Sequence, residues 1–219
     1  MRIGVGFSSG GLTPGEIVEC VRLAEELGYE SAWMTEGHAG DQFAILGACA
    51  VATKRITLGT AISSVFVRSA PTIAMAAATV DHLSGGRMIL GLGSSHKVQV
   101  EGEHGIPFGD AIPRVRDTVA VVRALLRDGV VAHHGEAIDI ERFELWFTPL
   151  RAHMPIYLAA LFPKMRATAF RKQPEPHTCR RCVSRRRFFA FPTPFHREGG
   201  GSGRAAEQWQ CPHRQEFPR

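Results

Sequence analysis

The sequence contains no apolar run long enough to span a bilayer, and its start does not resemble a signal peptide. A transmembrane helix needs about 20 consecutive apolar residues, and the opening segment MRIGVGFSSGG reaches a Gly and Ser turn before an apolar core of useful length forms. With five Cys in 219 residues, no disulfide framework is expected. These absences predict a cytoplasmic protein that does not enter the membrane, in which Cys20 and Cys49 are small apolar side chains on helices.

Leucine and isoleucine are missing from the last quarter of the chain. Between Arg166 and Arg219 the one branched aliphatic residue is Val183, and eleven Arg and one Lys stand against four Glu, a net charge of +8. Residues 1–165 carry a net charge of −3, so the balance of +5 for the whole chain comes from the tail. Because so few apolar residues cannot form a core, residues 166–219 are predicted to be a disordered tail and residues 1–165 a folded domain.

Asparagine is absent from the whole chain, whereas Gly, Ala and Arg are abundant. This composition is typical of a GC-rich gene. Such a gene, read out of frame, yields Arg, Pro, Gly, Ser, Cys and His without any period, which is the character of the tail. The segment from Arg166 is therefore predicted to come from a shifted reading frame.

Residues 1–165 alternate short β-rich runs with helical segments. The first helix begins with Thr13, Pro14 and Glu16, which together form a capping box with proline at the first helical position. The pattern predicts strands at 2–7, 31–37, 56–67, 88–95 and 154–161, and helices at 13–28, 41–55, 69–86 and 113–127. Such alternation is typical of parallel strands with right-handed crossovers, in either a doubly wound sheet or a (β/α) barrel. Residues 129–147 interrupt it with a predicted β-hairpin.

The loops after the predicted strands carry most of the polar candidates for a site. In both architectures these loops hold the functional residues, and here their polar side chains suit an anionic cofactor: Glu36, His38, Asp41, Ser63, Ser64, Arg68, Ser94, Ser95, His96, Lys97 and Lys164. Glu36 with His38 is a candidate general base with its partner. The stretch GLGSSH keeps two of the three glycines of a dinucleotide fingerprint and follows a fourth strand, so it does not favour a Rossmann site.

Other clusters favour simpler interpretations. His133 and His134 are neighbours in the hairpin and would point to opposite faces, so a metal site there is not favoured. The tail holds residues of the types that bind zinc but without the usual spacing: Cys179, Cys182, Cys211 and His213. Its Arg-rich stretch 180–189 would bind polyanions weakly and without specificity. We therefore expect no metal and no specific nucleic-acid partner.

Several blocks of the sequence together resemble the luciferase-like monooxygenase family, the flavin- or deazaflavin-dependent relatives of bacterial luciferase. These blocks are GEIVECVRLAEELGYESAWMTEG, RITLGTAISSVFVRSAPTIAMAAATVDHLSGGRMILGLGSS, HGIPF, RVRDTVAVVRALLRDG and MPIYLAALFPKM, in order between residues 2 and 165. The resemblance implies a (β/α)₈ barrel with FMN or coenzyme F420 across its C-terminal mouth. It also implies an oxidoreductase that exchanges hydride with an organic substrate, and the pattern favours F420 over FMN.

The resemblance assigns roles to most of the polar loop residues. Glu36 and His38 would lie near the cofactor ring, and a bulge with a non-proline cis peptide at Ser63 and Ser64 would support that ring. The remaining cofactor contacts would come from Ser94, Ser95 and Lys164, with His38 and His96 as the catalytic residues that manage protons. His96 stands where sugar-phosphate dehydrogenases of the family have a catalytic Glu, so that substrate class is not favoured.

The helical pattern dissolves near Arg166, before three of the eight βα units that the family implies. The expected fold is therefore a partial barrel of about five βα units. Because such a sheet leaves two edges open, we expect weak stability and association of two copies through these edges. The alternative to an oxidoreductase is a non-catalytic barrel fragment that binds polyanions through its tail.

Overall fold

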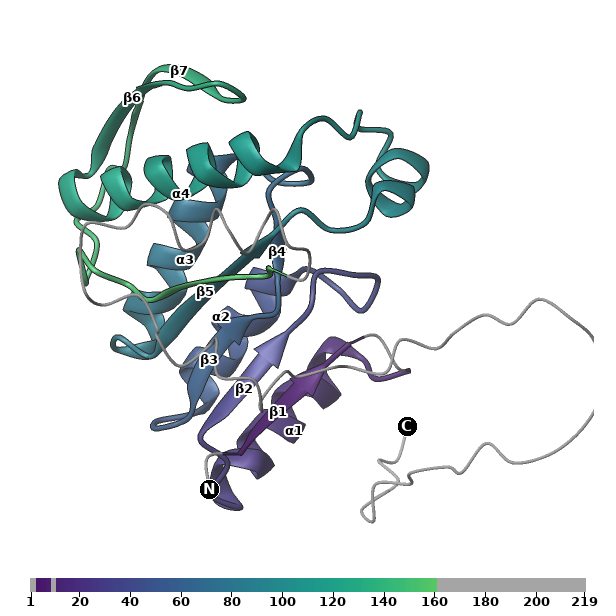
Figure 1. Cartoon of the computed structure of the whole chain (residues 1–219). Helices are drawn as coiled ribbons and strands as arrows, with labels where there is room; N and C mark the ends of the chain where they lie inside the picture. Colours follow the sequence, from purple (N-terminus) through teal and green to yellow (C-terminus); the bar gives the residue numbers. More distant parts are fainter. Residues whose placement is uncertain (1–2, 9–10, 161–219) are drawn as a thin grey trace, which may run out of the picture. The chain divides into compact units, whose positions relative to one another are not determined.

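The structure, a computed structural model, describes residues 3–8 and 11–160 (Figure 1). The predicted disordered tail 166–219 and the predicted site residue Lys164 lie outside the described residues. The same holds for the shifted reading frame and for the cysteine pair of the tail. These expectations stay predictions.

One sheet of parallel strands organises the described part of the chain. Its strands are β1 (Gly4–Phe7), β2 (Ser31–Met34), β3 (Thr57–Thr60), β4 (Ser63–Ser64), β5 (Met88–Gly93) and β8 (Ile156–Leu158). Leu92 of β5 pairs with both Ser63 and Leu158. Since a strand has two edges, β4 continues β3 along one edge of β5 while β8 occupies the other. The spatial order of the five predicted strands is thus their order in the sequence.

Helices connect these strands, and local sequence signals explain where they begin and end. They are α1 (Pro14–Glu26), α2 (Gln42–Ala52), α3 (Ala70–Ser84) and α4 (Ala111–Asp128). The predicted capping box is confirmed: Glu16 N donates to the Thr13 hydroxyl at 3.3 Å, and Thr13 N donates to the Glu16 carboxylate at 2.8 Å. Asp41 caps α2 and Ser69 caps α3, while Gly85 ends α3 with φ of +66°.

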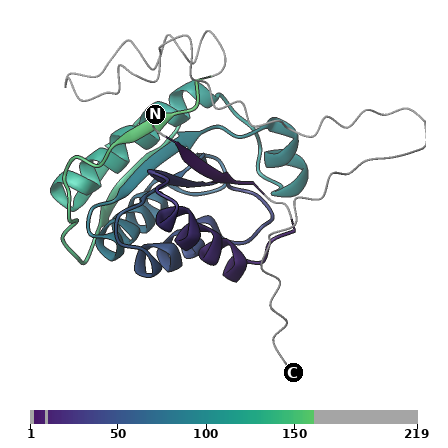
Figure 2. The same cartoon turned by 90° about the horizontal axis from the view of Figure 1, so that it is seen from below.

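Figures 1 and 2 show the helices on one side of the parallel sheet, which distinguishes the two candidate architectures. A doubly wound sheet is covered by helices on both faces, whereas a barrel keeps them outside. Side-chain burial agrees with this view, because Ala32 and Met34 of β2 are buried against the helices while Trp33, between them, is partly exposed. The described fold is therefore a partial (β/α) barrel, as the sequence predicts.

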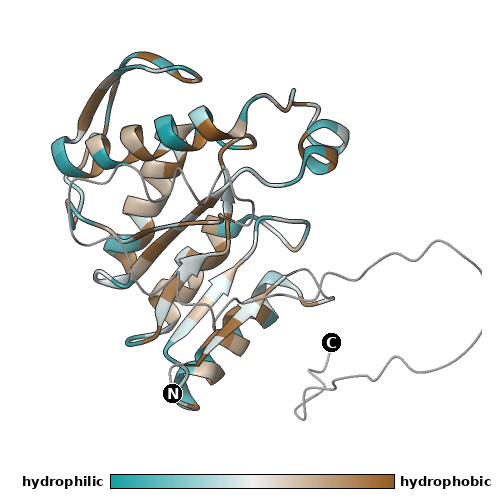
Figure 3. Cartoon of the chain, in the orientation of Figure 1, coloured by the Kyte–Doolittle hydropathy of each residue, from teal (hydrophilic) through white to brown (hydrophobic). Residues whose placement is uncertain are grey.

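The core lies between the sheet and its helices. Figure 3 shows apolar residues along β5 and on the helices next to it. Leu58, Leu90 and Leu92 of the sheet meet the buried residues Leu46 of α2 and Ile73 of α3, and all five are completely buried. Cys49 belongs to the same core as a free thiol, and burial raises its pKa to about 12, consistent with its predicted role as a small apolar residue.

The predicted third strand, 56–67, is divided in the structure. The chain leaves β3 at Thr60 and rejoins β5 as β4, and in between the Thr60 hydroxyl donates to the Gly91 carbonyl at 2.8 Å and accepts from Gly91 N at 2.7 Å. A side chain thus replaces the missing ladder bonds. The non-proline cis peptide joins Ala61 to Ile62, so the expectation that it lies at Ser63 and Ser64 is wrong by two residues.

Two further features surround the sheet. The predicted hairpin is confirmed as β6 (Val130–His134) paired antiparallel with β7 (Asp139–Glu144). A short π-helix, η1 (Gln99–Glu103), follows β5 and was not predicted.

No helix within residues 11–160 is both long enough and apolar enough to cross a membrane. Within the same range β1 pairs with β2 alone and β8 with β5 alone, so the association of copies through sheet edges stays a proposal.

Candidate functional site

Polar side chains gather where the parallel strands end. Glu36 follows β2, Ser63 and Ser64 form β4, and Ser94 with Ser95 follows β5. These carboxyl ends meet at one edge of the sheet because all the strands run in the same direction. The expected location of the site thus agrees with the topology, although the roles of the individual residues stay predictions.

Glu36 is the centre of this group. Its Oε2 accepts from Ser64 N at 2.7 Å and from the Ser63 hydroxyl at 3.2 Å, and its Oε1 accepts from Arg68 Nε at 2.5 Å. The Glu36 side chain is 13% exposed, so these charge-assisted bonds lie largely out of water. A single carboxylate therefore joins the end of β2 to β4 and to the segment before α3.

Arg68 connects this carboxylate to the start of α2. Its Nη2 also donates to the carboxylate of Asp41, the residue that caps α2, and its guanidinium lies 5.3 Å from the centre of the Phe43 ring. Burial alone would raise the pKa of Asp41, but the hydrogen bonds from Arg68 and Ala44 N more than offset it, so this pKa is lowered. Burial likewise opposes the charge on Arg68, yet its bonds to Asp41 and Glu36 raise the pKa of the guanidinium.

The two predicted catalytic histidines lie at the rim, away from this carboxylate. His38 Nε2 lies 3.1 Å from Glu103 Oε2 of η1, and 73% of the His38 side chain is exposed. Glu36 is bonded to Arg68, whereas His38 contacts Glu103. The pairing of Glu36 and His38 as a base and its partner stays a prediction. His96 is exposed at the start of the segment that leads into η1. Their proposed role in proton transfer stays a prediction.

Ser94 and Ser95 follow β5 directly, in a segment that is neither helix nor strand. Ser95 has φ of +60°, which is uncommon for a residue other than glycine, and its hydroxyl donates to Gln99 Oε1 at 2.8 Å. The Ser94 hydroxyl donates to the Ser95 carbonyl at 3.3 Å. Both side chains are partly buried, so their hydroxyls border the mouth of the partial barrel.

Small residues line the sheet beneath the mouth, on the face that carries no helices. A Cβ atom added at Gly93 would come within 2.9 Å of Ile62 Cγ1 and 3.1 Å of the Ala159 Cβ, and one at Gly59 would come within 2.4 Å of the Trp33 ring. Trp33 itself stacks on Tyr157 of β8, with ring centroids 5.9 Å apart. This combination of flat aromatic and small apolar surface below several hydroxyls and backbone groups fits a planar ring with polar substituents.

The histidines of the hairpin were considered as possible metal ligands. In the hairpin, His133 Nε2 lies 3.8 Å from Asp117 Oδ1 and His134 Nδ1 lies 2.6 Å from Asp139 Oδ1, so the neighbouring histidines face different partners, as expected. Among the described residues, no group of three or more His, Cys, Asp or Glu could hold a metal ion.

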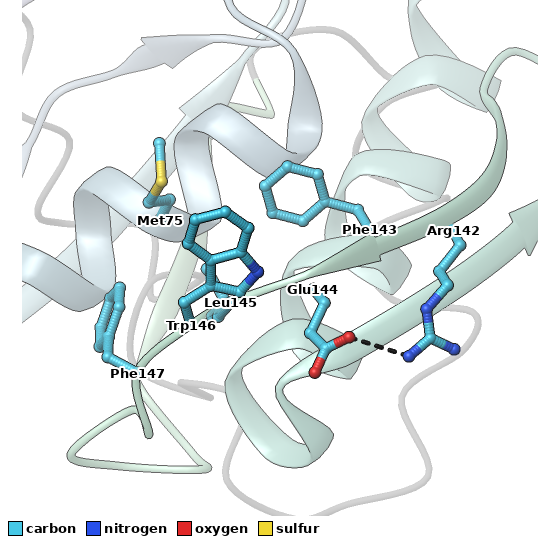
Figure 4. Close-up of a pocket in the computed structure, with 7 residues that line it drawn as sticks. All are labelled: Met75, Arg142, Phe143, Glu144, Leu145, Trp146 and Phe147. Carbon is cyan, nitrogen blue, oxygen red and sulfur yellow. Dashed lines mark hydrogen bonds and ion pairs between the residues drawn. The ribbon is translucent and has the colours of Figure 1, made fainter.

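A cavity of about 520 Å³ lies elsewhere, next to the second hairpin strand (Figure 4). None of the predicted site residues lines it; its walls are Met75, Arg142, Phe143, Glu144, Leu145, Trp146 and Phe147. Figure 4 shows Arg142 and Glu144 joined by an ion pair, and Trp146 is 97% exposed. Apart from this exposed ion pair, the residues that line the cavity are apolar.

Sequence reasoning underestimated two residues of the site. Arg68 was counted among the polar loop residues without a role, although an Arg that follows a strand end is a natural partner for Glu36. Gln42 was not singled out at all, because a Gln at the start of an apolar helix has no distinctive sequence signal. The structure buries Gln42 completely and directs its amide group to two carbonyl oxygens.

Known proteins resemble this chain over most of its length. The 5,10-methylenetetrahydromethanopterin reductase of Archaeoglobus fulgidus is 32% identical over 68% of this chain and 45% of its own length. The F420-dependent glucose-6-phosphate dehydrogenase of Amycolatopsis mediterranei is 30% identical over 73% of this chain and 52% of its own. This chain therefore spans about half the length of the curated relatives it matches.

A solved structure extends the comparison. The coenzyme F420-dependent tetrahydromethanopterin reductase of Methanopyrus kandleri superposes with a TM-score of 0.69 at 26% identity, over 77% of this chain and 52% of its own. A sequence model of the luciferase-like monooxygenase family matches residues 1–173. Most of the chain is thus covered, and its parallel strands, outer helices and polar strand ends agree with the match. The chain belongs to the luciferase-like monooxygenase family.

Proposed function

We propose that this chain binds coenzyme F420 at the carboxyl ends of its parallel strands and forms part of an oxidoreductase that exchanges hydride with an organic substrate. The observation that carries the proposal is the group formed by Glu36, Ser63, Ser64 and Arg68, which borders a surface of small and aromatic residues. Two relatives named above are F420-dependent by name, which favours F420 over the alternative, FMN.

The residues of this chain would bind the cofactor and hold the strand ends around it in position. When bound, the deazaflavin supplies the two-electron chemistry. Ser94 and Ser95 would offer hydroxyls to it, and Lys164 would meet its phosphate. Glu36 is already engaged by Arg68, so its role would be to hold β4 in place. His38 and His96, exposed at the rim, would exchange protons with the substrate and with water.

The proposed substrate is an organic hydride donor or acceptor. The relatives act, by name, on a sugar phosphate and on a pterin derivative. His96 in place of the expected Glu argues against a sugar phosphate.

A titration tests the proposal directly. The purified chain is added to F420 and, separately, to FMN, and the fluorescence of each cofactor is followed to saturation. We expect saturable binding of F420 that weakens when Ser94 and Ser95 are both changed to Ala. Trp146→Ser serves as a control, because Trp146 lies outside the site and is almost fully exposed.

The competing outcomes are distinct. No saturable change with either cofactor contradicts the proposed function and favours the non-catalytic fragment. Preference for FMN would keep the site and change the cofactor. Salt-sensitive binding to a polyanion, lost on deletion of residues 166–219, would support the alternative function of the tail.

A further inference from the structure

Gln42 is a buried polar side chain at the first turn of α2. It is 1% exposed, although its neighbours in the helix are almost all apolar. Burying an amide group is costly unless it makes hydrogen bonds, so its partners show what holds it there. Neither helix capping nor core packing explains this residue, because Asp41 caps α2 and a Leu or Met would fill the same space without polar atoms.

The amide nitrogen of Gln42 ties together two carbonyl groups from separate parts of the chain. Nε2 donates to the carbonyl of Met34 at 2.7 Å and to the carbonyl of Ile62 at 3.2 Å. Met34 ends β2, and Ile62 lies in the connection between β3 and β4. The carbonyl of Met34 also accepts from Ala61 N at 2.7 Å. One NH₂ group therefore links α2, β2 and the connection 61–62.

The orientation of this amide follows from its partners. Two acceptors face the nitrogen, whereas Oε1 is buried and has no hydrogen-bond partner among the described residues. Turning the amide over would place an oxygen against two carbonyl oxygens and lose both bonds. A side chain with two N–H donors is thus required, and neither Glu nor Met supplies them.

The connection held by Gln42 carries the residues that face the proposed cofactor. On one side of it the Thr60 hydroxyl is bonded to Gly91, and on the other Ser64 N is bonded to Glu36. The Ile62 side chain lies over Gly93, so close that a Cβ atom at Gly93 would come within 2.9 Å of it. Movement of residue 62 would change the shape of the surface beneath the mouth.

We propose that Gln42 is a positioning residue, which holds the connection 61–62 and thereby fixes Ile62 and β4 for cofactor binding. This inference rests on the proposed function. Gln42 would act through the backbone of Ile62 and would not touch the cofactor.

Three variants separate positioning from general stability. Gln42→Met keeps the volume and removes both donors, and Gln42→Glu keeps the shape and replaces the donors by a carboxyl group. Thr53→Val is the matched control, since Thr53 is a buried polar residue at the other end of α2, with its hydroxyl bonded to the Cys49 carbonyl at 2.6 Å. For each full-length variant we measure the melting temperature, the affinity for F420 and the amide hydrogen exchange of peptides that cover residues 61–67.

We expect Gln42→Met to bind F420 about tenfold more weakly than the wild type, the effect of losing one to two buried hydrogen bonds. Its peptides 61–67 should exchange faster. Thr53→Val should lower the melting temperature while leaving both the affinity and this exchange close to the wild-type values. If Gln42→Met loses stability but keeps its affinity and exchange rate, as Thr53→Val does, Gln42 is a structural residue and the inference is wrong.

The pH dependence of Gln42→Glu gives an independent signature. As a carboxylate this side chain repels both carbonyl oxygens, but as a carboxylic acid it can donate one hydrogen bond. Its affinity for F420, relative to the wild type, should therefore improve as the pH falls from 8 to 5. The affinity of the wild type is measured over the same pH range as a reference, because it includes any effect of the charged groups nearby, which are Glu36, Asp41 and Arg68.

The two proposals fail differently. If the wild-type chain does not bind F420, the proposed function and this inference both fall. If the wild type binds and the ratio of the Gln42→Glu and wild-type affinities does not depend on pH, only the positioning role of Gln42 is overturned.

Discussion

The two faces of the parallel sheet differ in what covers them. On the helix side, Leu58, Leu90 and Leu92 are completely buried, whereas on the other side Trp33 and Tyr157 are only partly buried and glycines recur along the strands. The first face resembles the core of any α/β protein, since its apolar side chains interlock with α2 and α3. The second face has room and flat surfaces. This contrast suggests that the helix side supplies most of the stability, while the open face and its C-terminal edge are available for a ligand.

The largest loss of stability is expected for a residue on the helix side of the sheet. Leu90→Ala should reduce the free energy of unfolding by about 2–5 kcal/mol, because it removes a fully buried side chain and leaves a cavity. Ile89→Ala is the matched control, since Ile89 is the adjacent residue, points to the open face and is partly exposed. Urea denaturation measures both. Equal losses would show that the two faces contribute alike, against the contrast drawn above.

The next largest loss of stability is expected for a glycine on the open face. Gly91→Ala would place a Cβ atom 2.0 Å from the Thr60 carbonyl oxygen, a backbone atom that cannot move without displacing the β3–β4 connection. We expect a loss of about 1–3 kcal/mol in the free energy of unfolding, together with weaker F420 binding. Gly15→Ala in α1 has no atom within 4 Å of the new Cβ and should be neutral or slightly stabilising. A stable Gly91→Ala chain with wild-type affinity would contradict the close packing at this connection.

The stability that the C-terminal edge of the sheet contributes should decrease at acidic pH. Because the pKa of Asp41 in the folded state lies below its ordinary value of 3.8, its ion pair with Arg68 stabilises the fold above that value. This contribution should disappear as the pH falls through the folded-state pKa. Asp41→Asn should therefore be less stable than the wild type at pH 6, and the difference should shrink as the pH is lowered below 3.8.

Asp110→Asn tests whether the pH dependence belongs to the ion pair or to helix capping. Asp110 caps α4 through a bond from Ile112 N at 3.1 Å. Because Asn caps a helix about as well as Asp, this variant should lose much less stability at pH 6 than Asp41→Asn does. Urea denaturation between pH 2 and pH 7 supplies the data. A difference between Asp41→Asn and the wild type that is the same at all pH values would refute a contribution from the carboxylate charge.

The smallest change in the free energy of unfolding is expected for a residue that lies on neither face of the sheet. Trp146→Ser should change the free energy of unfolding by no more than about 0.5 kcal/mol, because the side chain is 97% exposed. Leu145→Ala, at the adjacent residue, should cost more since Leu145 is 7% exposed and belongs to the core. Thermal melting compares the two. A large loss in Trp146→Ser would mean that the tryptophan is covered in solution, for instance by a second copy of the chain.

Local signals explain why most elements were predictable. Thr13 with Glu16, Asp41 and Ser69 mark helix starts by hydrogen bonds that span three residues, so the sequence alone carries the information. The hairpin and the buried strands follow in the same way from the spacing of apolar residues and from turn residues. The placement of the predicted site residues at the strand ends also follows, once parallel strands are inferred.

The sequence by itself determined the order of the strands and helices, their approximate limits and the family, and it predicts a site at the carboxyl ends of the strands. Only the tertiary structure decided that Glu36 pairs with Arg68, 32 residues away, and not with the nearby His38. It also decided that the third strand divides at Thr60 and that Gln42 holds Ile62. These features depend on contacts between residues far apart in the chain, and no local pattern of charge or hydropathy encodes them.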